Sequence, residues 1–213
     1  GRFTDAKNFD NVPKICKYIL QRGINIKWYI IGYGTDEDLI KNKIEQENMQ
    51  DNVILLGKKE NPYPYIKACD IYVQPSRYEG KAVTVGEAQI LGKPVVITNY
   101  TTAKSQVRDN VDGYVCKLSI EGIAEGIEKL YKDKNLRIKL SNNCKNTDCG
   151  EKILKTVEKH KVVVIPAVSS TCTKDGLTAG KKLTAQKTAG VYRKLLGAAS
   201  EKHMKTDCYE FCW

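Results

Sequence analysis

The segment from residue 71 to residue 87 reads IYVQPSRYEGKAVTVGE, and its pattern of apolar and polar residues indicates the fold class of the chain. It opens with the apolar run Ile71–Gln74, which Pro75 interrupts, as is typical of a short buried strand. After a polar loop, Val83–Leu91 has the length of a helix and ends before Gly92. The segment therefore predicts a strand, a loop and a helix, the repeating unit of a parallel α/β sheet.

The same alternation extends from residue 1 to about residue 132. Further strands are expected at Ile26–Ile31, Val53–Leu56, Val95–Thr98 and Tyr114–Val115. Helices are expected at Asn8–Gln21, from Thr35 or Asp36 to Glu47, at Tyr63–Ala68, at Thr101–Val107, from the cap Ser119 to Lys132, and at Leu136–Leu140. We therefore expect an α/β fold, a parallel sheet with helices on both faces that binds ligands at the carboxyl ends of its strands.

Composition and charge narrow the classes of function. The chain has 213 residues, of which 41% are hydrophobic and 28% charged, and its longest β-rich apolar run, Trp28–Ile31, is far shorter than the roughly 20 residues of a membrane span. Gly1–Thr4 lacks the charged-then-apolar pattern of a signal peptide. The net charge is +10, but aromatic and basic residues are not interleaved as in RNA-binding modules, so we expect no nucleic-acid partner.

The sequence changes character near residue 150. We assign residues 1–150 to the α/β domain and residues 151–213 to an irregular, basic, Cys-containing extension of unknown role. In the extension, Val162–Ile165 could form a strand and Leu183–Leu196 a helix. The alternatives are a disordered tail, a cloning artefact, or a peptide that binds a membrane or a partner, and the first two are favoured.

The chain has eight cysteines in two groups. Cys16, Cys69 and Cys116 stand in apolar or helical surroundings and are expected to be buried thiols. The pairs Cys144-x4-Cys149 and Cys208-x3-Cys212 resemble zinc pairs superficially, but His160 and His203 do not supply a usual zinc spacing. No metal site is therefore expected. Disulfide bonds within the extension are an alternative for a chain that meets an oxidising compartment.

The loop and helix after residue 74 could carry chemistry. Glu79 stands in the loop, Glu87 lies about one turn inside the helix, and the helix start offers unpaired backbone amides to an anion. Gly80 lets a ligand approach the backbone, and a carboxylate can accept two sugar hydroxyls. Two acids that bracket such a helix start suit a nucleotide sugar. The alternative is an ordinary strand, loop and helix with solvated acids, which the spacing alone favours.

An ordered set of motifs over about residues 1–130 resembles the C-terminal, donor-binding domain of the family 4 retaining glycosyltransferases. That domain is the Rossmann-like, doubly wound C-terminal half of a GT-B fold. The matching positions are Arg2, Lys7, Gly32–Gly34, Pro75–Gly80, Glu87–Ala88, Gly92–Val96 and Gly113. Lys81-Ala82 departs from the commoner Phe-Gly or Phe-Pro and resembles a bacterial surface-polysaccharide subgroup. The resemblance further implies that the chain starts after the domain's first strand and lacks the N-terminal acceptor domain.

The resemblance also implies roles for individual residues. Arg2 and Lys7 would bind the diphosphate and stabilise the leaving group, and Glu79 would bind donor-sugar hydroxyls near the reacting carbon. Glu87 would bind the ribose. The remaining donor contacts implied are Gly34, where the donor reaches the sheet edge, and the backbone of Gly80, Lys81, Ala82 and Val83. No metal cofactor is implied, because the cationic side chains and the helix end take its place. Ser76 and Arg77 are expected to shape the loop.

The implied activity is retaining glycosyl transfer from a UDP- or GDP-sugar, by a front-face route, in polysaccharide or lipopolysaccharide biosynthesis. The implied setting is cytoplasmic, with peripheral association of the full-length enzyme at the inner face of the membrane. We expect the fragment to be inactive by itself. The alternative is a non-catalytic or split-subunit module that binds a nucleotide sugar and needs a partner chain.

Overall fold

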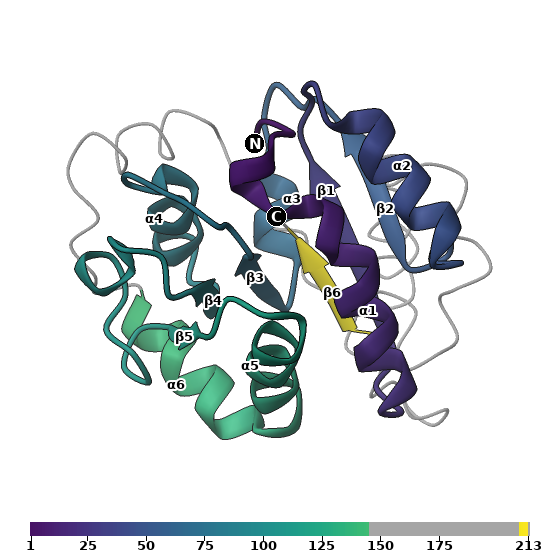
Figure 1. The fold of residues 1–213 in the computed structure, drawn as a ribbon. Helices are drawn as coiled ribbons and strands as arrows, with labels where there is room; N and C mark the ends of the chain where they lie inside the picture. Colours follow the sequence, from purple (N-terminus) through teal and green to yellow (C-terminus); the bar gives the residue numbers. More distant parts are fainter. Residues whose placement is uncertain (145–208, 213) are drawn as a thin grey trace, which may run out of the picture.

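The computed structural model describes residues 1–144 and 209–212, which form one six-stranded parallel sheet with helices on both of its faces (Figure 1). The strand order is β2-β1-β6-β3-β4-β5. In chain order the elements are α1 Val12–Gln21, β1 Ile26–Ile31, α2 Glu37–Gln46, β2 Val53–Gly57, α3 Tyr63–Ala68, β3 Ile71–Gln74, α4 Val83–Ile90, β4 Val95–Thr98, β5 Tyr114–Cys116, α5 Ile120–Lys132, α6 Lys134–Cys144 and β6 Tyr209–Cys212, with 3-10 turns at Asp5–Lys7, Phe9–Asn11 and Ala103–Ser105. The predicted α/β class with a doubly wound parallel sheet is confirmed.

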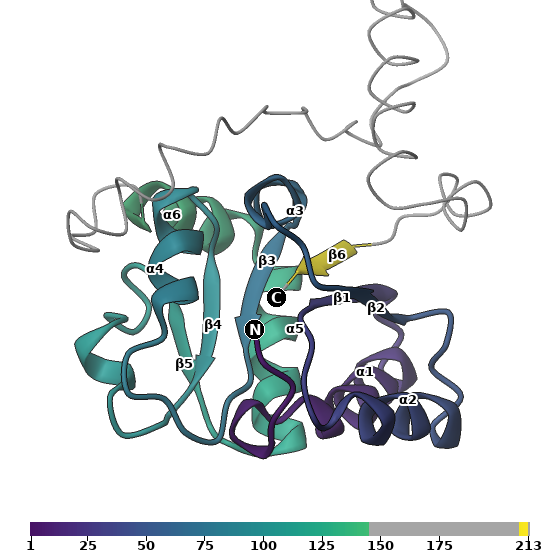
Figure 2. The ribbon, with the colours of Figure 1, turned by 90° about the horizontal axis from the view of Figure 1, so that it is seen from above.

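The predicted bounds of β1, α3, β3 and β4 agree with the structure. Every residue of β3 and of β4 is buried, as the unbroken apolar runs predict for strands covered on both faces. In β1 the side chains of Ile26, Trp28 and Ile30 are fully buried. Helix α1 packs against α5 on one face of the sheet and α3 against α4 on the other (Figure 2). The core therefore lies on both sides of the central strands.

Helix α5 begins as the sequence predicts. The Ser119 hydroxyl accepts a hydrogen bond from the Gly122 amide at 2.9 Å, which satisfies one of the amides that a helix start leaves unpaired. The side chains of Ile123, Ile127 and Leu130 are buried, as their helical spacing predicts. The buried side chains hold α5 against the central strands.

Helices α2 and α4 differ from their predicted bounds by one or two residues at an end, and three other predicted helices differ by more. The helix predicted from Asn8 begins at Val12, because Asn8 has a left-handed backbone (φ 60°) that separates two 3-10 turns from the helix. The helix predicted over Thr101–Val107 is only the 3-10 turn Ala103–Ser105. The last helix, α6, is longer than predicted.

The thiols of Cys16, Cys69 and Cys116 are buried, as predicted, and Cys144 is buried as well. All four are free. Burial raises the pKa of the Cys116 thiol to about 12. These cysteines therefore behave as small apolar core residues.

Strand β6 is not anticipated by any pattern in the sequence. It lies in the middle of the sheet, between β1 and β3, although it comes from the far end of the chain (Figure 1). The strand considered at Val162–Ile165, the helix considered at Leu183–Leu196, and Cys149, Cys172 and Cys208 lie outside the described residues.

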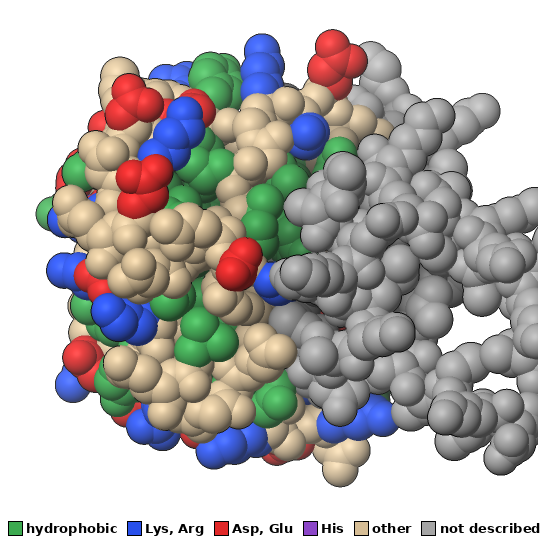
Figure 3. Space-filling view, turned by 90° about the vertical axis from the view of Figure 1, so that its right-hand side faces the viewer, with side chains coloured by type: hydrophobic (Ala, Val, Ile, Leu, Met, Phe, Trp, Pro, Cys, Tyr) green, Lys and Arg blue, Asp and Glu red, His purple; other side chains and the backbone are tan. Residues whose placement is uncertain are grey.

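The surface of the described part carries both signs of charge. On the face drawn in Figure 3, Lys and Arg side chains alternate with Asp and Glu and do not form one continuous basic stripe. Among residues 1–144 and 209–212, no helix combines the length and apolar character that a membrane crossing requires.

Candidate functional site

The candidate site lies at the carboxyl ends of the parallel strands, where three segments meet. These are the N-terminal segment Gly1–Lys7, the turn Gly32–Thr35 after β1, and the loop from Pro75 to Ala82 that leads from β3 into α4. Arg2 pairs with Tyr33 in an isolated parallel bridge, so the N-terminal segment runs beside the turn after β1. The edge of the sheet that the sequence indicates is therefore the one where the expected residues gather.

Lys7 and Glu79 form the central ion pair of the site. The Lys7 Nζ atom lies 2.6 Å from Glu79 Oε1, and both side chains are largely buried. The same oxygen accepts hydrogen bonds from Ser76 Oγ at 2.7 Å and from Gln74 Nε2 at 2.6 Å. A carboxylate oxygen held by three donors is fixed in position.

The loop that carries Glu79 is tied to the N-terminal segment. The Arg77 guanidinium makes two parallel bonds to the Asp10 carboxylate, at 2.9 and 2.8 Å, and a third to the Asp5 carbonyl at 2.6 Å. The Arg77 amide also donates to the Ala6 carbonyl at 2.8 Å. The expectation that Ser76 and Arg77 shape the loop is confirmed by these contacts.

Two residues outside the predicted site, Asn8 and Thr102, complete this support. Asn8 is buried and donates from Nδ2 to the Pro75 carbonyl at 2.8 Å. Thr102 donates to the Glu79 carbonyl at 2.8 Å. The left-handed backbone of Asn8 is a conformation that Asn tolerates better than most residues. An Asn at position 8 is therefore the one sequence signal that could have indicated this supporting turn.

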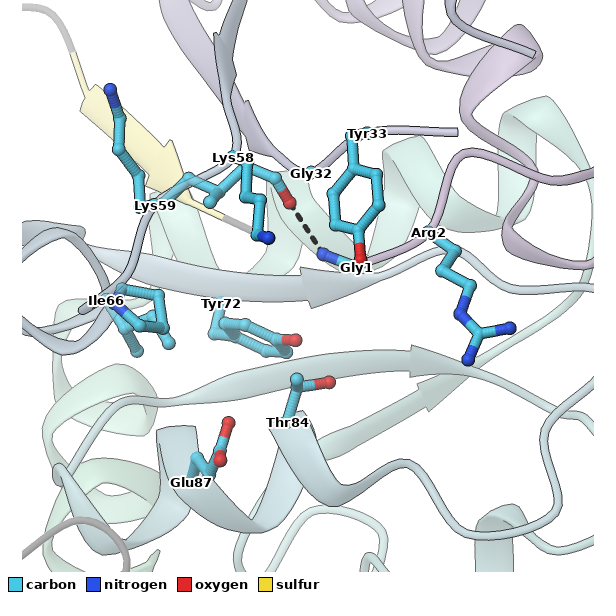
Figure 4. Close-up of a pocket in the computed structure, with 12 residues that line it drawn as sticks. Gly1, Arg2, Gly32, Tyr33, Lys58, Lys59, Ile66, Tyr72, Thr84 and Glu87 are labelled. Atoms are coloured by element: carbon cyan, nitrogen blue, oxygen red, sulfur yellow. Dashed lines mark hydrogen bonds between the residues drawn. The ribbon is translucent and has the colours of Figure 1, made fainter. Parts of the chain in front are cut away.

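Beside this network lies a cavity of about 290 Å³ (Figure 4). Its lining includes Arg2 and Glu87 from the expected set. The lining residues that the sequence reading did not name as ligands are Gly1, Ile31, Tyr33, Lys58, Lys59, Pro62, Ile66, Tyr72 and Thr84, together with Gly32 from the G-x-G motif. Lys58 and Lys59 follow the carboxyl end of β2, so the strand-end rule could have found them.

Glu87 projects from α4 toward the cavity, next to Thr84 (Figure 4). It is buried, with 9% exposure, and its Oε1 accepts a hydrogen bond from the Tyr63 hydroxyl at 2.9 Å. Burial, and then the charge of Glu87, raises the pKa of Tyr63 well above its ordinary value. Tyr63 therefore stays a hydrogen-bond donor to Glu87 at any ordinary pH.

Cationic groups surround the opposite wall of the cavity. Arg2 is exposed and makes no ion pair with any residue in the described ranges. The Lys58 Nζ atom lies 5.2 Å from the centre of the Tyr33 ring, a cation–π distance. The cavity is thus lined by one buried carboxylate and several cations, an arrangement that suits a ligand with both hydroxyl and anionic groups.

The turn after β1 requires glycine for close packing. A Cβ atom on Gly34 would lie 2.4 Å from the Phe3 carbonyl oxygen, and one on Gly32 would lie 2.1 Å from the Gly1 carbonyl oxygen. Gly34 itself does not line the cavity. In this structure these glycines let the N-terminal segment run against the turn.

The start of α4 carries the remaining expected residues. Gly80, Lys81 and Val83 are exposed, whereas Ala82 is buried and forms the N-cap without any side-chain cap. None of these four residues lines the cavity. No side chain caps the first amides of α4, and the Val85 amide donates to the Ala82 carbonyl at 3.0 Å. The described residues contain no group of three or more His, Cys, Asp or Glu placed to hold a metal ion.

The N-terminal amine is also part of this region. The Gly1 nitrogen donates to the Ile31 carbonyl at 2.6 Å, and burial together with the charge of Lys7 lowers the pKa of the amine to about 5.

Comparison with known proteins finds relatives of this chain. The chain is 30% identical over 173 residues to UDP-Gal:alpha-D-GlcNAc-diphosphoundecaprenol alpha-1,3-galactosyltransferase of Escherichia coli. The match covers 79% of this chain and 44% of that enzyme, so the chain spans less than half of its relative's length.

Two solved structures share the fold. TarM of S. aureus, in complex with Fondaparinux, alpha-GlcNAc-glycerol and UDP, superposes with a TM-score of 0.66 at 24% identity, over 75% of this chain and 34% of TarM. The C-terminal domain of the group 1 glycosyl transferase LpcC from Francisella tularensis superposes with a TM-score of 0.61 at 22% identity, over 73% of this chain and 82% of that domain.

The family model for glycosyl transferases group 1 matches residues 1–147, more than half of the chain. With the parallel sheet and its likeness to GT-B structures, this match shows that the chain belongs to the glycosyl transferases group 1 and carries the C-terminal part of their GT-B fold.

Proposed function

We propose that this chain is the donor-binding half of a retaining glycosyltransferase and binds a uridine- or guanosine-diphosphate sugar. The observation that supports this most strongly is the placement of the buried Glu87 carboxylate opposite Arg2 across one cavity, beside the Lys7–Glu79 pair. A nucleotide sugar has hydroxyl groups at both ends and a diphosphate between them. The site offers carboxylate acceptors for the hydroxyl groups and cations for the diphosphate, in the same order.

Glu87 would accept hydrogen bonds from the ribose hydroxyls. Its Oε1 already accepts one from Tyr63, which fixes the orientation of the carboxylate before the ligand arrives. Lys58 and Lys59, which also line the cavity, would add positive charge near the nucleotide. The buried Glu87 carboxylate needs hydrogen-bond donors, and the hydroxyl groups of the ligand's sugar would supply them.

Arg2 and Lys7 would hold the diphosphate, together with the first amides of α4. Negative charge builds on the diphosphate as the glycosidic bond breaks, and cations aimed at that charge lower the barrier. Glu79 would position the donor-sugar hydroxyls and stabilise an oxocarbenium-like state. In the proposed front-face route, Glu79 acts by positioning and charge and forms no bond to the sugar.

The relative from E. coli is named for transfer from UDP-Gal to a lipid-linked sugar. We therefore propose that the transfer serves polysaccharide or lipopolysaccharide assembly, on the cytoplasmic side of a membrane, and that the full-length enzyme associates with that surface. The acceptor would bind opposite the donor site, on a second domain.

Calorimetric titration with uridine- and guanosine-diphosphate sugars tests the proposal. We expect one class to bind, and Glu87→Gln to weaken it by roughly tenfold or more, because a hydrogen bond to a charged group contributes about 1.5–3 kcal/mol. Glu45→Gln, at an exposed position on α2, is the matched control and should bind as the parent does. Absence of binding for both classes, or equal affinity of the Glu87 variant, would refute the proposal.

A second candidate is a nucleotide-sugar-binding module that transfers sugar only with a partner chain. Its support is that the side chains expected to bind the donor, Lys7 with Glu79 and Arg2 with Glu87, meet within this one chain. Donor binding with neither release of free sugar nor transfer by the isolated chain would favour this candidate. Turnover by the isolated chain would exclude it.

A further inference from the structure

Gln74 lies between the cavity and the Lys7–Glu79 pair. It is the last residue of β3, at the carboxyl end of the sheet, and its side chain is fully buried. A buried amide group is costly unless it is hydrogen-bonded, so its partners indicate its role. The Gln74 amide bonds in two directions, to Glu79 on one side and to a residue of the cavity wall on the other.

The nitrogen of this amide holds one oxygen of Glu79. Gln74 Nε2 donates to Glu79 Oε1 at 2.6 Å and to Ser76 Oγ at 2.8 Å. The Ser76 hydroxyl and Lys7 Nζ are the other two donors to that same oxygen. In the described part of the chain, no hydrogen bond or ion pair reaches Glu79 Oε2. The two oxygens of this carboxylate are therefore unequal, since the protein holds Oε1 and leaves Oε2 to accept from a ligand.

The oxygen of the same amide faces the cavity wall. Gln74 Oε1 accepts a hydrogen bond from the Tyr72 hydroxyl at 3.0 Å and a longer one from the Thr84 hydroxyl at 3.4 Å. Tyr72 and Thr84 both line the cavity (Figure 4), whereas Gln74 itself does not. Burial raises the pKa of Tyr72 well above its ordinary value, so its hydroxyl keeps the proton that it donates to Gln74.

The Glu79 carboxylate determines which way the Gln74 amide points. A carboxylate only accepts hydrogen bonds, so the amide nitrogen must face Glu79 and the amide oxygen must face Tyr72. The reversed amide would place its oxygen against the carboxylate oxygen, with no hydrogen between them. The amide and the carboxylate thus hold each other in one orientation, and the cavity wall and the Lys7–Glu79 pair belong to one hydrogen-bond network.

We propose that Gln74 is a positioning residue of the donor site, whose amide holds Oε1 of Glu79 so that Oε2 faces the hydroxyl groups of the donor sugar. This role rests on the donor-binding function proposed above. Gln74 acts through Glu79 and does not contact the donor. Its bond to Tyr72 anchors the amide from the other side, so the amide cannot turn away when the sugar binds.

Replacement of the amide by an apolar side chain of similar length tests this role in calorimetric titration. Gln74→Met should weaken binding of the nucleotide sugar that binds the parent about three- to tenfold, and should change the affinity for the matching nucleoside diphosphate less than about twofold, because only the sugar reaches Glu79. When Glu79→Gln is already present, Gln74→Met should weaken sugar binding no further, since it acts through that carboxylate. Gln89→Met is the matched control, at a buried glutamine that does not line the cavity, and should bind both ligands as the parent does.

A second variant covers the case in which Gln74→Met does not fold. Gln74→Glu places a carboxyl group against Glu79, and two carboxyl groups this close do not both ionise, so the pair binds a proton at mildly acidic pH. The protonated group donates to Glu79 as the amide did, whereas at higher pH the two carboxylates repel each other beside Lys7. The ratio of sugar to diphosphate affinity of this variant should therefore rise at least about threefold from about pH 8 to about pH 5.5, and the parent's ratio should not.

The outcomes separate this role from the donor-binding function. Equal weakening of sugar and diphosphate binding by Gln74→Met, or a sugar affinity equal to the parent's, would overturn the role of Gln74 and leave the donor-binding function in place. An affinity ratio of Gln74→Glu that does not change with pH would overturn it as well. Absence of nucleotide-sugar binding by the parent would instead refute the donor-binding function, and the role of Gln74 with it.

Discussion

Lys7 and Glu79 are 72 positions apart in the sequence, yet their side chains meet at 2.6 Å where the N-terminal segment crosses the loop after β3. Each residue alone could be a solvated surface charge. Their contact, and the bonds from Ser76 and Gln74 to the same carboxylate oxygen, show that the two loops form one site.

The first prediction concerns this ion pair. Lys7→Met should lower the free energy of unfolding by about 1–2 kcal/mol, because the mostly buried Glu79 carboxylate loses its cation. Adding Glu79→Gln should recover part of that loss, since a neutral amide does not need the cation. Urea unfolding of the parent, both single variants and the double variant measures the coupling. Strictly additive losses would contradict the prediction.

The second prediction concerns the clamp between the loops. Arg77→Lys keeps the charge but cannot make two parallel bonds to Asp10, so it should cost about 1–2 kcal/mol of stability. Arg108→Lys is the control, because Arg108 pairs with Asp112 while most of its side chain is exposed, and it should cost less than about 0.5 kcal/mol. Urea unfolding compares the two. Similar losses would mean that the Arg77 geometry has no special importance.

The third prediction compares two glycines. Gly34→Ala places a methyl group 2.4 Å from the Phe3 carbonyl oxygen and should destabilise the fold by about 1–3 kcal/mol or more. Gly80→Ala meets no atom within 4 Å and should change stability by less than about 0.5 kcal/mol. Thermal unfolding followed by circular dichroism distinguishes them. A stable Gly34 variant would show that the N-terminal segment does not pack against the turn.

The fourth prediction concerns the hydroxyl that orients Glu87. Tyr63→Phe removes a donor at 2.9 Å and should weaken nucleotide-sugar binding roughly three- to tenfold, the effect of about 1 kcal/mol. Because the pKa of Tyr63 is raised above its ordinary value, the parent's affinity should not change through ionisation of this group up to pH 10. Tyr78→Phe, at a residue with 70% exposure, is the control in calorimetric titration. Equal affinities would remove Tyr63 from the site.

The fifth prediction concerns the buried thiols. Cys16, Cys69, Cys116 and Cys144 should react with iodoacetamide at pH 8 far more slowly in the native protein than in urea. Peptide mass mapping identifies each site. The raised pKa of Cys116 favours the native state while the thiol is protonated. That contribution should be lost as the pH rises from about 9, the ordinary value, through about 12. Fast native labelling of Cys116 would contradict its burial.

The sequence predicts the strands well for a physical reason. β1, β3 and β4 are mostly apolar runs that are followed by Gly, Pro or a polar residue, so the signal for each strand lies within the strand itself. Strand β6 has four residues, too few for a period, and its place is set by the open position between β1 and β3. The start of α1 depends on the backbone of Asn8, which a distant carbonyl stabilises.

The site is predictable to the same extent. The acids and cations of the candidate site stand in motifs that the sequence displays, and the structure brings Lys7 to Glu79 and Arg2 into the cavity that Glu87 lines. Their supports are not predictable in this way. The partners of Arg77 and Tyr63 are remote in the sequence, and only the folded backbone brings them within hydrogen-bond distance.

The bonds from Arg77 to Asp10, and to the carbonyls of Asp5 and Ala6, have a further consequence for thermal motion. Segments joined in this way open and close as one cooperative unit, because neither can fray while the other stays in place. Warming the protein should therefore disorder the N-terminal segment and the loop after β3 in a single local transition, below the temperature at which the sheet itself melts.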